Sequence, residues 1–183
     1  MKKIDTLLNF FKNFLMRIFV IEEKEIKPSN EMTYSSITIA NYFIKSKSKF
    51  GQLTPMKILK LVYLADAWYM TLKDGEEKLV NEKVQAWDYG PVFPNLYRSI
   101  KINGRIDLTE PLSYDKEETI KNEDVGFLEK IWEMYGQYDG IMLSAMTHKK
   151  GTPWEKVYCK GCNSEIPNDL IIDHYKPKLK EAN

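Results

Sequence analysis

The stretch LTPMKILKLVYLADAWYMTLK, residues 53–73, decides the fold. Thr54 followed by Pro55 predicts the start of a helix, because threonine caps free N–H groups and proline suits the first helical position. The helix is expected to end where Asp74-Gly75 follows. Apolar side chains lie nearly all round it, which is typical of a helix in the centre of a domain. We therefore predict that this helix is the most buried element.

Hydrophobic periodicity predicts further helices on both sides of this stretch. They are expected at 33–46, 94–103, 122–136 and 139–147, in a short segment from 152, and from 167 until Pro177 closes the last one. Short strands are predicted at 79–80 and 84–87, with a candidate third strand at 105–108. The expected fold class is mainly α (α+β): a compact helical domain around a central buried helix, with a small antiparallel β-sheet.

The first 31 residues are predicted to lie outside this domain, as an amphipathic helix at 1–21 and a charged linker. Lys12, Asn13 and Arg17 interrupt the apolar side chains, which argues against a signal peptide or a membrane-spanning helix. Three roles stay open: packing on the chain's own domain, contact with a protein partner, and docking on a membrane surface, which the few cations disfavour. The domain is placed at 32–177 and a tail at 178–183.

The composition favours a protein-binding module. The chain has 27 Lys and Arg against 26 Asp and Glu, whereas nucleic-acid binding draws on an excess of cations. Aromatic residues make up 13%, which suits a core and a protein interface. No GxSxG, P-loop, GxGxxG or HExxH motif is present. We expect a cytoplasmic protein that is not an enzyme, needs no cofactor and has no nucleic acid as its primary ligand.

Cys159 and Cys162 form a C-x-x-C motif in a segment that looks like a loop. Free thiols are the favoured interpretation. A structural zinc needs four ligands, and adding His148 and His174 does not give the spacing of a zinc finger. A redox pair of the thioredoxin type needs a helix that opens at the first cysteine. We therefore expect no bound metal.

Asp66 lies in the middle of the central helix among apolar neighbours. A buried carboxylate is unfavourable unless it is paired or hydrogen-bonded. One interpretation is a structural bond to a buried donor, such as the Trp87 indole, a tyrosine hydroxyl or His148. Asp66→Asn is then expected to lower stability. The other is a polar site that faces a partner or a small ligand. Asp88 and His148 invite the same two interpretations.

Four blocks of the sequence resemble the Panacea domain, the family of SocA-like antitoxins and phage-associated GepA-like proteins. The blocks are Leu53–Tyr69, Gln85–Val92, Leu143–His148 and Thr152–Trp154, and the resemblance extends over residues 32–176. Their order is more specific than any single block. The family usually has an acidic residue at the position of Gln85, and its pattern includes neither the C-x-x-C motif nor the amphipathic first segment.

The resemblance implies the antitoxin of a toxin–antitoxin system, which binds and neutralises a cognate toxin encoded by an adjacent gene. Because partners differ within the family, no contact residue carries over. The motif residues are interpreted as scaffold: Lys57, Lys60, Tyr63, Trp68, Trp87, Gly90, Pro91, Pro153 and Trp154. Two alternatives stay open. One is an adaptor that presents a partner to a protease or another machine, and the other is a mobile-element enzyme that uses Asp66, Asp88 and His148.

Overall fold

A computed structural model of the 183-residue chain describes residues 33–103, 107–116 and 118–180. The amphipathic helix and linker predicted at 1–31 lie outside the described residues. So do positions 105 and 106 of the candidate third strand. None of the helices in the described ranges combines the length and the apolar character needed to cross a membrane.

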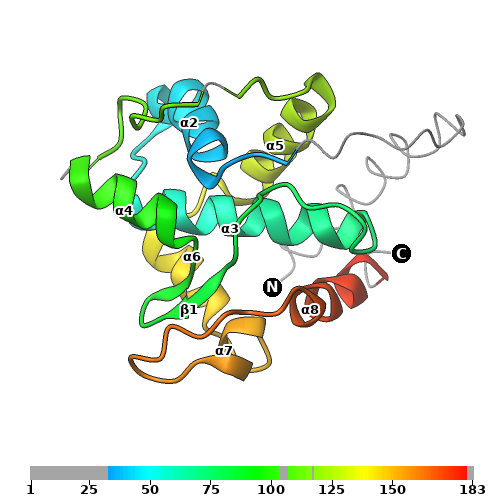
Figure 1. Cartoon of the computed structure of the whole chain (residues 1–183). Helices are drawn as coiled ribbons and strands as arrows, with labels where there is room; N and C mark the ends of the chain where they lie inside the picture. Colours follow the sequence, from blue (N-terminus) through cyan, green and yellow to red (C-terminus); the bar gives the residue numbers. More distant parts are fainter. Residues whose placement is uncertain (1–32, 104–106, 117, 181–183) are drawn as a thin grey trace, which may run out of the picture.

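Helix α3 (Pro55–Leu72) runs through the middle of the molecule, as predicted (Figure 1). The side-chain oxygen of Thr54 accepts a hydrogen bond from the backbone N–H of Lys57 at 3.3 Å and caps the first turn. After the helix, Asp74 and Gly75 both have positive φ, and the N–H of Gly75 bonds to the carbonyl of Met70 at 2.8 Å. This is a left-handed helix stop, and the predicted start and end are both confirmed.

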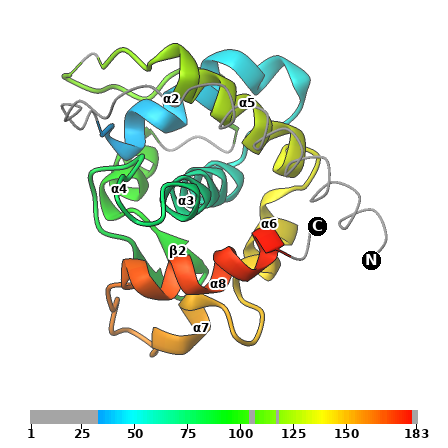
Figure 2. The same cartoon turned by 90° about the vertical axis from the view of Figure 1, so that its right-hand side faces the viewer.

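The other helices pack around α3 (Figures 1 and 2). Helices α2 (Ser36–Lys47) and α5 (Asn122–Tyr135) cover one side of α3, and α4 (Pro94–Asn103) flanks α3. Helices α6 (Gly140–Thr147) and α8 (Asn168–Lys180) cover the opposite side. Helix α7 (Pro153–Val157) packs against the outside of α8. A short 3-10 helix, η1 (Ser48–Phe50), follows α2. The helices predicted at 139–147 and from 152 begin at capping residues: Asp139 accepts from the Met142 N–H at 2.7 Å, and Thr152 from the Glu155 N–H at 3.3 Å.

The sheet is a hairpin of β1 (Gln85–Trp87) and β2 (Gly90–Val92), paired antiparallel with Trp87 opposite Gly90. The prediction of a strand at 79–80 was wrong, because Val80 makes only an isolated parallel bridge with Tyr34. The partner strand lies instead directly after β1, since Gly90, at φ +107°, lets the chain reverse within two residues.

The chain segment beside β1 is also not the predicted one. In the described part of 105–108, the N–H of Leu108 bonds to the carbonyl of Leu53 at 2.9 Å, away from the hairpin. Glu165 forms an antiparallel bridge with Gln85, and the Ala86 N–H donates to the Ser164 carbonyl at 2.8 Å. The C-terminal third of the chain is thereby tied to the hairpin.

Helix α8 continues to Lys180, although it was predicted to close at Pro177. Proline removes one i→i−4 hydrogen bond, here the bond to the carbonyl of Asp173. Asp173 is exposed, so water can satisfy its carbonyl group. The loss is therefore small enough for the helix to run through the proline.

Candidate functional site

The turn between β1 and β2 lies over the side chain of Lys60, which comes from the second turn of α3. Lys60 is 1% exposed, and its Nζ donates a hydrogen bond to the carbonyl oxygen of Pro91 at 3.0 Å. Among the described residues, no carboxylate forms an ion pair with it. Burial without a counter-charge lowers the pKa of Lys60 to about 7. Lys60, interpreted from the sequence as scaffold, is thus a buried amine with donor capacity to spare.

The glycine of the turn is explained by this lysine. A Cβ at Gly90 would lie 2.6 Å from Nζ of Lys60 and 3.0 Å from Cε1 of His148. The backbone there also has φ +107°, which favours glycine. Gly90 therefore leaves room for the ammonium group, and Pro91 supplies its acceptor.

His148 and Trp154 bring two further motif blocks to the same turn. His148 follows α6 and is half-buried, with Nδ1 2.6 Å from the carbonyl oxygen of Ser144 and Nε2 3.4 Å from that of Asp88. Its ring centroid lies 4.0 Å from that of Trp154, whose indole N–H donates to the carbonyl of Trp87 at 2.8 Å. Blocks far apart in the sequence thus meet around one hairpin.

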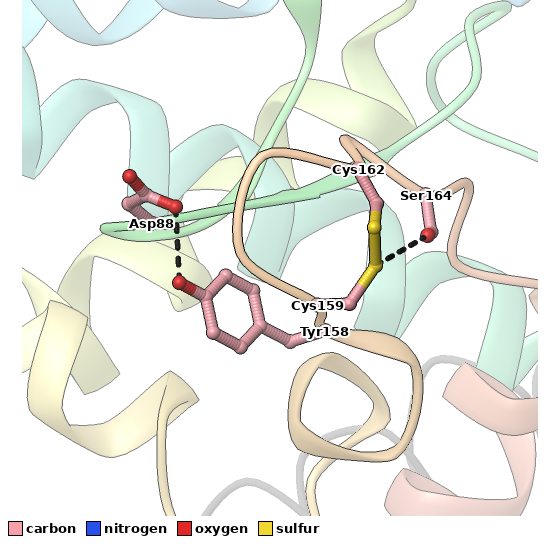
Figure 3. The surroundings of a disulfide bond; sticks show 5 residues. All are labelled: Asp88, Tyr158, Cys159, Cys162 and Ser164. Atoms are coloured by element: carbon pink, nitrogen blue, oxygen red, sulfur yellow. Dashed lines mark hydrogen bonds between the residues drawn. A yellow bond between two sulfur atoms is a disulfide. The ribbon is translucent and has the colours of Figure 1, made fainter.

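Cys159 and Cys162 form a disulfide in an exposed loop beside this hairpin (Figure 3). The position in a loop is confirmed, and the prediction of free thiols was wrong. A tight turn, in which the Cys162 N–H bonds to the Cys159 carbonyl at 3.1 Å, brings the two Cα atoms to 5.5 Å, within disulfide range. Just before the loop, the Tyr158 hydroxyl donates to Oδ1 of Asp88 at 3.0 Å and ties the loop to the turn.

A groove of about 260 Å³ lies between α3, the hairpin turn and the disulfide loop. We call it the turn groove; its lining residues are Met56, Leu59, Lys60, Trp87, Asp88, Tyr89, Gly90, Val92, Tyr97, Gly161 and Asn163. Most of the exposed wall is apolar. A larger hollow of about 660 Å³ is more open and is lined mainly by polar side chains, among them Lys78, Lys83 and Arg98.

Three large apolar side chains are exposed, one in the wall of this groove and two in the first turn of α6. Tyr89 is 73% exposed, Ile141 81% and Met142 50%. Ser144 donates through Oγ to the carbonyl of Tyr89 at 3.0 Å, and Ile141 lies one turn earlier on the same side of α6. Sequence periodicity grouped Ile141 with the apolar residues of this helix; only the structure shows that Leu143 is buried and Ile141 is not.

Asp66 lies elsewhere, on the part of α3 that faces residues 79–82. It is fully buried, and its Oδ1 accepts the backbone N–H of Val80 at 2.9 Å, so none of the three predicted kinds of donor supplies this bond. Its Oδ2 has no hydrogen-bond partner in the described part of the chain. Burial raises the pKa of Asp66 from 3.8 to about 6 and outweighs the attraction of Lys78.

The three residues of the enzyme alternative do not converge among the described contacts. Asp66 bonds to Val80, and the carboxylate of Asp88 bonds to Tyr158. Only the backbone carbonyl of Asp88 faces His148. A shared acid-base site would need these side chains to face one substrate position, and the described hydrogen bonds of Asp66 and Asp88 lead to different parts of the fold.

Replacing both Cys159 and Cys162 by serine is expected to lower the free energy of unfolding by about 2 kcal/mol or less, because the bond closes a very short loop. Denaturant titration with and without dithiothreitol measures this. The reductant should destabilise the wild type by the same amount and leave the serine variant unchanged. Equal stability of the wild type in both conditions would contradict the disulfide.

The family profile described as "Antitoxin SocA-like, Panacea domain" matches residues 58–155, which include Lys60, Gly90, His148 and Trp154. A curated relative, "Antitoxin SocA" of Caulobacter vibrioides (strain NA1000 / CB15N), is 25% identical over 122 residues. That alignment covers 57% of this chain and 60% of the relative, so the chain spans less than two thirds of the relative's length. No solved structure matches the chain. Because the matched range exceeds half of the 183 residues, this chain belongs to the family of SocA-like antitoxins with a Panacea domain.

Proposed function

We propose that this chain is a cytoplasmic, non-enzymatic antitoxin that binds a cognate toxin protein, encoded by an adjacent gene, and neutralises it by direct contact. The observation that carries the proposal is the exposure of three large apolar side chains, Tyr89 in the wall of the turn groove and Ile141 and Met142 in the first turn of α6, on a chain that belongs to a family of antitoxins. Grouped exposed apolar side chains mark protein interaction sites, and aromatic and methionine residues are enriched in interface cores.

Co-expression tests the proposal. The adjacent gene is induced alone and together with this chain, and growth and co-purification are followed. Growth arrest by the neighbour alone, rescued by this chain with recovery of a complex, is the expected result. A neighbour that is harmless alone, or one that stays toxic and unbound, contradicts it. A toxin whose level falls only when a protease is also present identifies the adaptor alternative instead.

Two matched variants locate the contact. Ile141→Glu is expected to weaken toxin binding about tenfold or more, because it places a charge in the apolar surface. Ile102→Glu, at an equally exposed isoleucine of α4, is the control and should bind like the wild type. Both changes lie on the surface, so each should alter stability by only about 0.5 kcal/mol. Titration calorimetry with the co-purified toxin measures the two affinities, and equal weakening by both variants would contradict this surface.

A further inference from the structure

Within residues 33–103, 107–116 and 118–180, the amine of Lys60 has no counter-charge. Among these residues its Nζ has one hydrogen bond, to the carbonyl of Pro91, and the side chain is 1% exposed while still lining the turn groove. A buried ammonium is costly in free energy unless it is paired. Lys57, one turn earlier, differs: its Nζ donates to the carbonyl of Gly136 at 2.6 Å and lies 4.9 Å from the centre of the Trp132 ring, outside this groove.

We propose that the turn groove receives an acidic side chain of the protein partner, flanked by apolar residues, and that its carboxylate pairs with the ammonium of Lys60. This inference rests on the proposed function and assigns the chemistry of the contact. The carboxylate would supply the charge that Lys60 lacks, and the apolar groove would exclude water and strengthen the pair.

The size and position of the groove favour a side chain from a folded partner. A volume of about 260 Å³ is below the range of ordinary small-molecule pockets. Tyr89 lines the groove and is also part of the exposed surface with Ile141. A partner that covers Ile141 and Tyr89 is therefore placed to insert one side chain into the turn groove, which Lys60 lines.

Lys60→Met tests the pairing, because methionine keeps the apolar stem and removes the charge. The variant is expected to fold, which a melting curve checks, because methionine fills a similar volume and removes a buried charge that is costly without a partner. Its affinity for the co-purified toxin should fall about 30-fold or more. Lys57→Met is the matched control and should stay within about threefold of the wild type.

Substitutions in the toxin make the test independent of the folding of the variant. Each surface Glu or Asp of the toxin is changed to Gln or Asn, and affinity is measured against wild type and against Lys60→Met. Substitution of one acidic residue of the toxin should lower its affinity for the wild type about 30-fold and change its affinity for Lys60→Met little. The reason is that the two substitutions remove the same interaction.

Three results would overturn the inference. The first is Lys60→Met that binds like wild type, and the second is the absence of any toxin carboxylate that couples to Lys60. The third is coupling to Lys60 that is lost when only the toxin's terminal carboxylate is amidated, because the partner would then be the chain terminus and not a side chain. In these cases the toxin still binds the wild type, so the proposed function stands. A toxin that does not bind the wild type at all refutes the proposed function, and this inference with it.

Discussion

Gly90→Ala is expected to lower the free energy of unfolding by about 3 kcal/mol. A left-handed backbone costs a non-glycine residue roughly 1–3 kcal/mol. The new Cβ would also lie 2.6 Å from Nζ and 2.9 Å from Cε of Lys60. The lysine end is flexible in principle, but moving it breaks the bond to Pro91 and leaves an ammonium unsatisfied in the interior, at a further roughly 1–3 kcal/mol. For a chain of this length, the melting temperature should fall by about 10 °C.

Gly126→Ala provides the matched control. Gly126 lies within α5, and a Cβ there would meet nothing within 4 Å. Alanine in a helix interior is favoured over glycine by roughly 0.5–1 kcal/mol, so this variant should be slightly more stable than the wild type. Thermal unfolding of both variants measures the contrast. A Gly90→Ala protein with the melting temperature of the wild type would contradict the close approach of this turn to Lys60.

Asp66→Asn is expected to gain stability relative to the wild type by about 3 kcal/mol as the pH rises from about 4 to 7. Burial raises the pKa of Asp66 from 3.8 to about 6, so the folded state binds the proton more tightly than the unfolded state. The stabilisation from this group is therefore complete below about pH 4 and is lost as the pH rises through 6. A shift of roughly two units corresponds to about 3 kcal/mol. Asparagine carries no such titration and keeps an oxygen for the N–H of Val80.

Denaturant unfolding at a series of pH values measures the difference between variant and wild type, so that other titrating groups cancel. Asp66→Ala is the control: its difference curve should run parallel to that of Asn but lower, because the Val80 N–H loses its acceptor at a cost of about 1–3 kcal/mol. A difference that stays flat between pH 4 and 7 would show that Asp66 is not desolvated in the folded state.

The effect now expected of Asp66→Asn differs from the one drawn from the sequence alone, because burial raises the pKa of Asp66. The sequence indicated a buried carboxylate and a loss of stability on replacement by asparagine. In the structure the donor is a backbone N–H of the segment after α3, and burial dominates the pKa. Every residue except proline has a backbone N–H group, so the types of the side chains do not indicate which backbone group the fold places beside Asp66. The sequence therefore could not identify Val80 as the donor.

The helices were predictable because their signals are local. Thr54-Pro55, Asp139 and Thr152 act on N–H groups within three residues of themselves, and the apolar pattern of 53–73 depends only on helical spacing. These features established the central helix, the order of elements and the motif blocks by themselves.

The hairpin partner, the disulfide and the site were decided by tertiary structure. Residues 90–92 pair with β1, and residues 79–80 do not, because the backbone angle of Gly90 lets the chain reverse there. Cys159 and Cys162, predicted as free thiols, form a disulfide because a tight turn brings their Cα atoms within bonding range. Ile141 and Leu143 have similar hydrophobicity, yet only packing against α3 buries one and leaves the other to solvent. In the sequence Lys60 is an ordinary cation. It is buried because the hairpin turn of Gly90 and Pro91 lies over its ammonium group. Burial and charge compensation are properties of the whole packed chain. For this reason the motif residues could be identified from the sequence, whereas the exposed surface and the buried amine could be identified only from the tertiary structure.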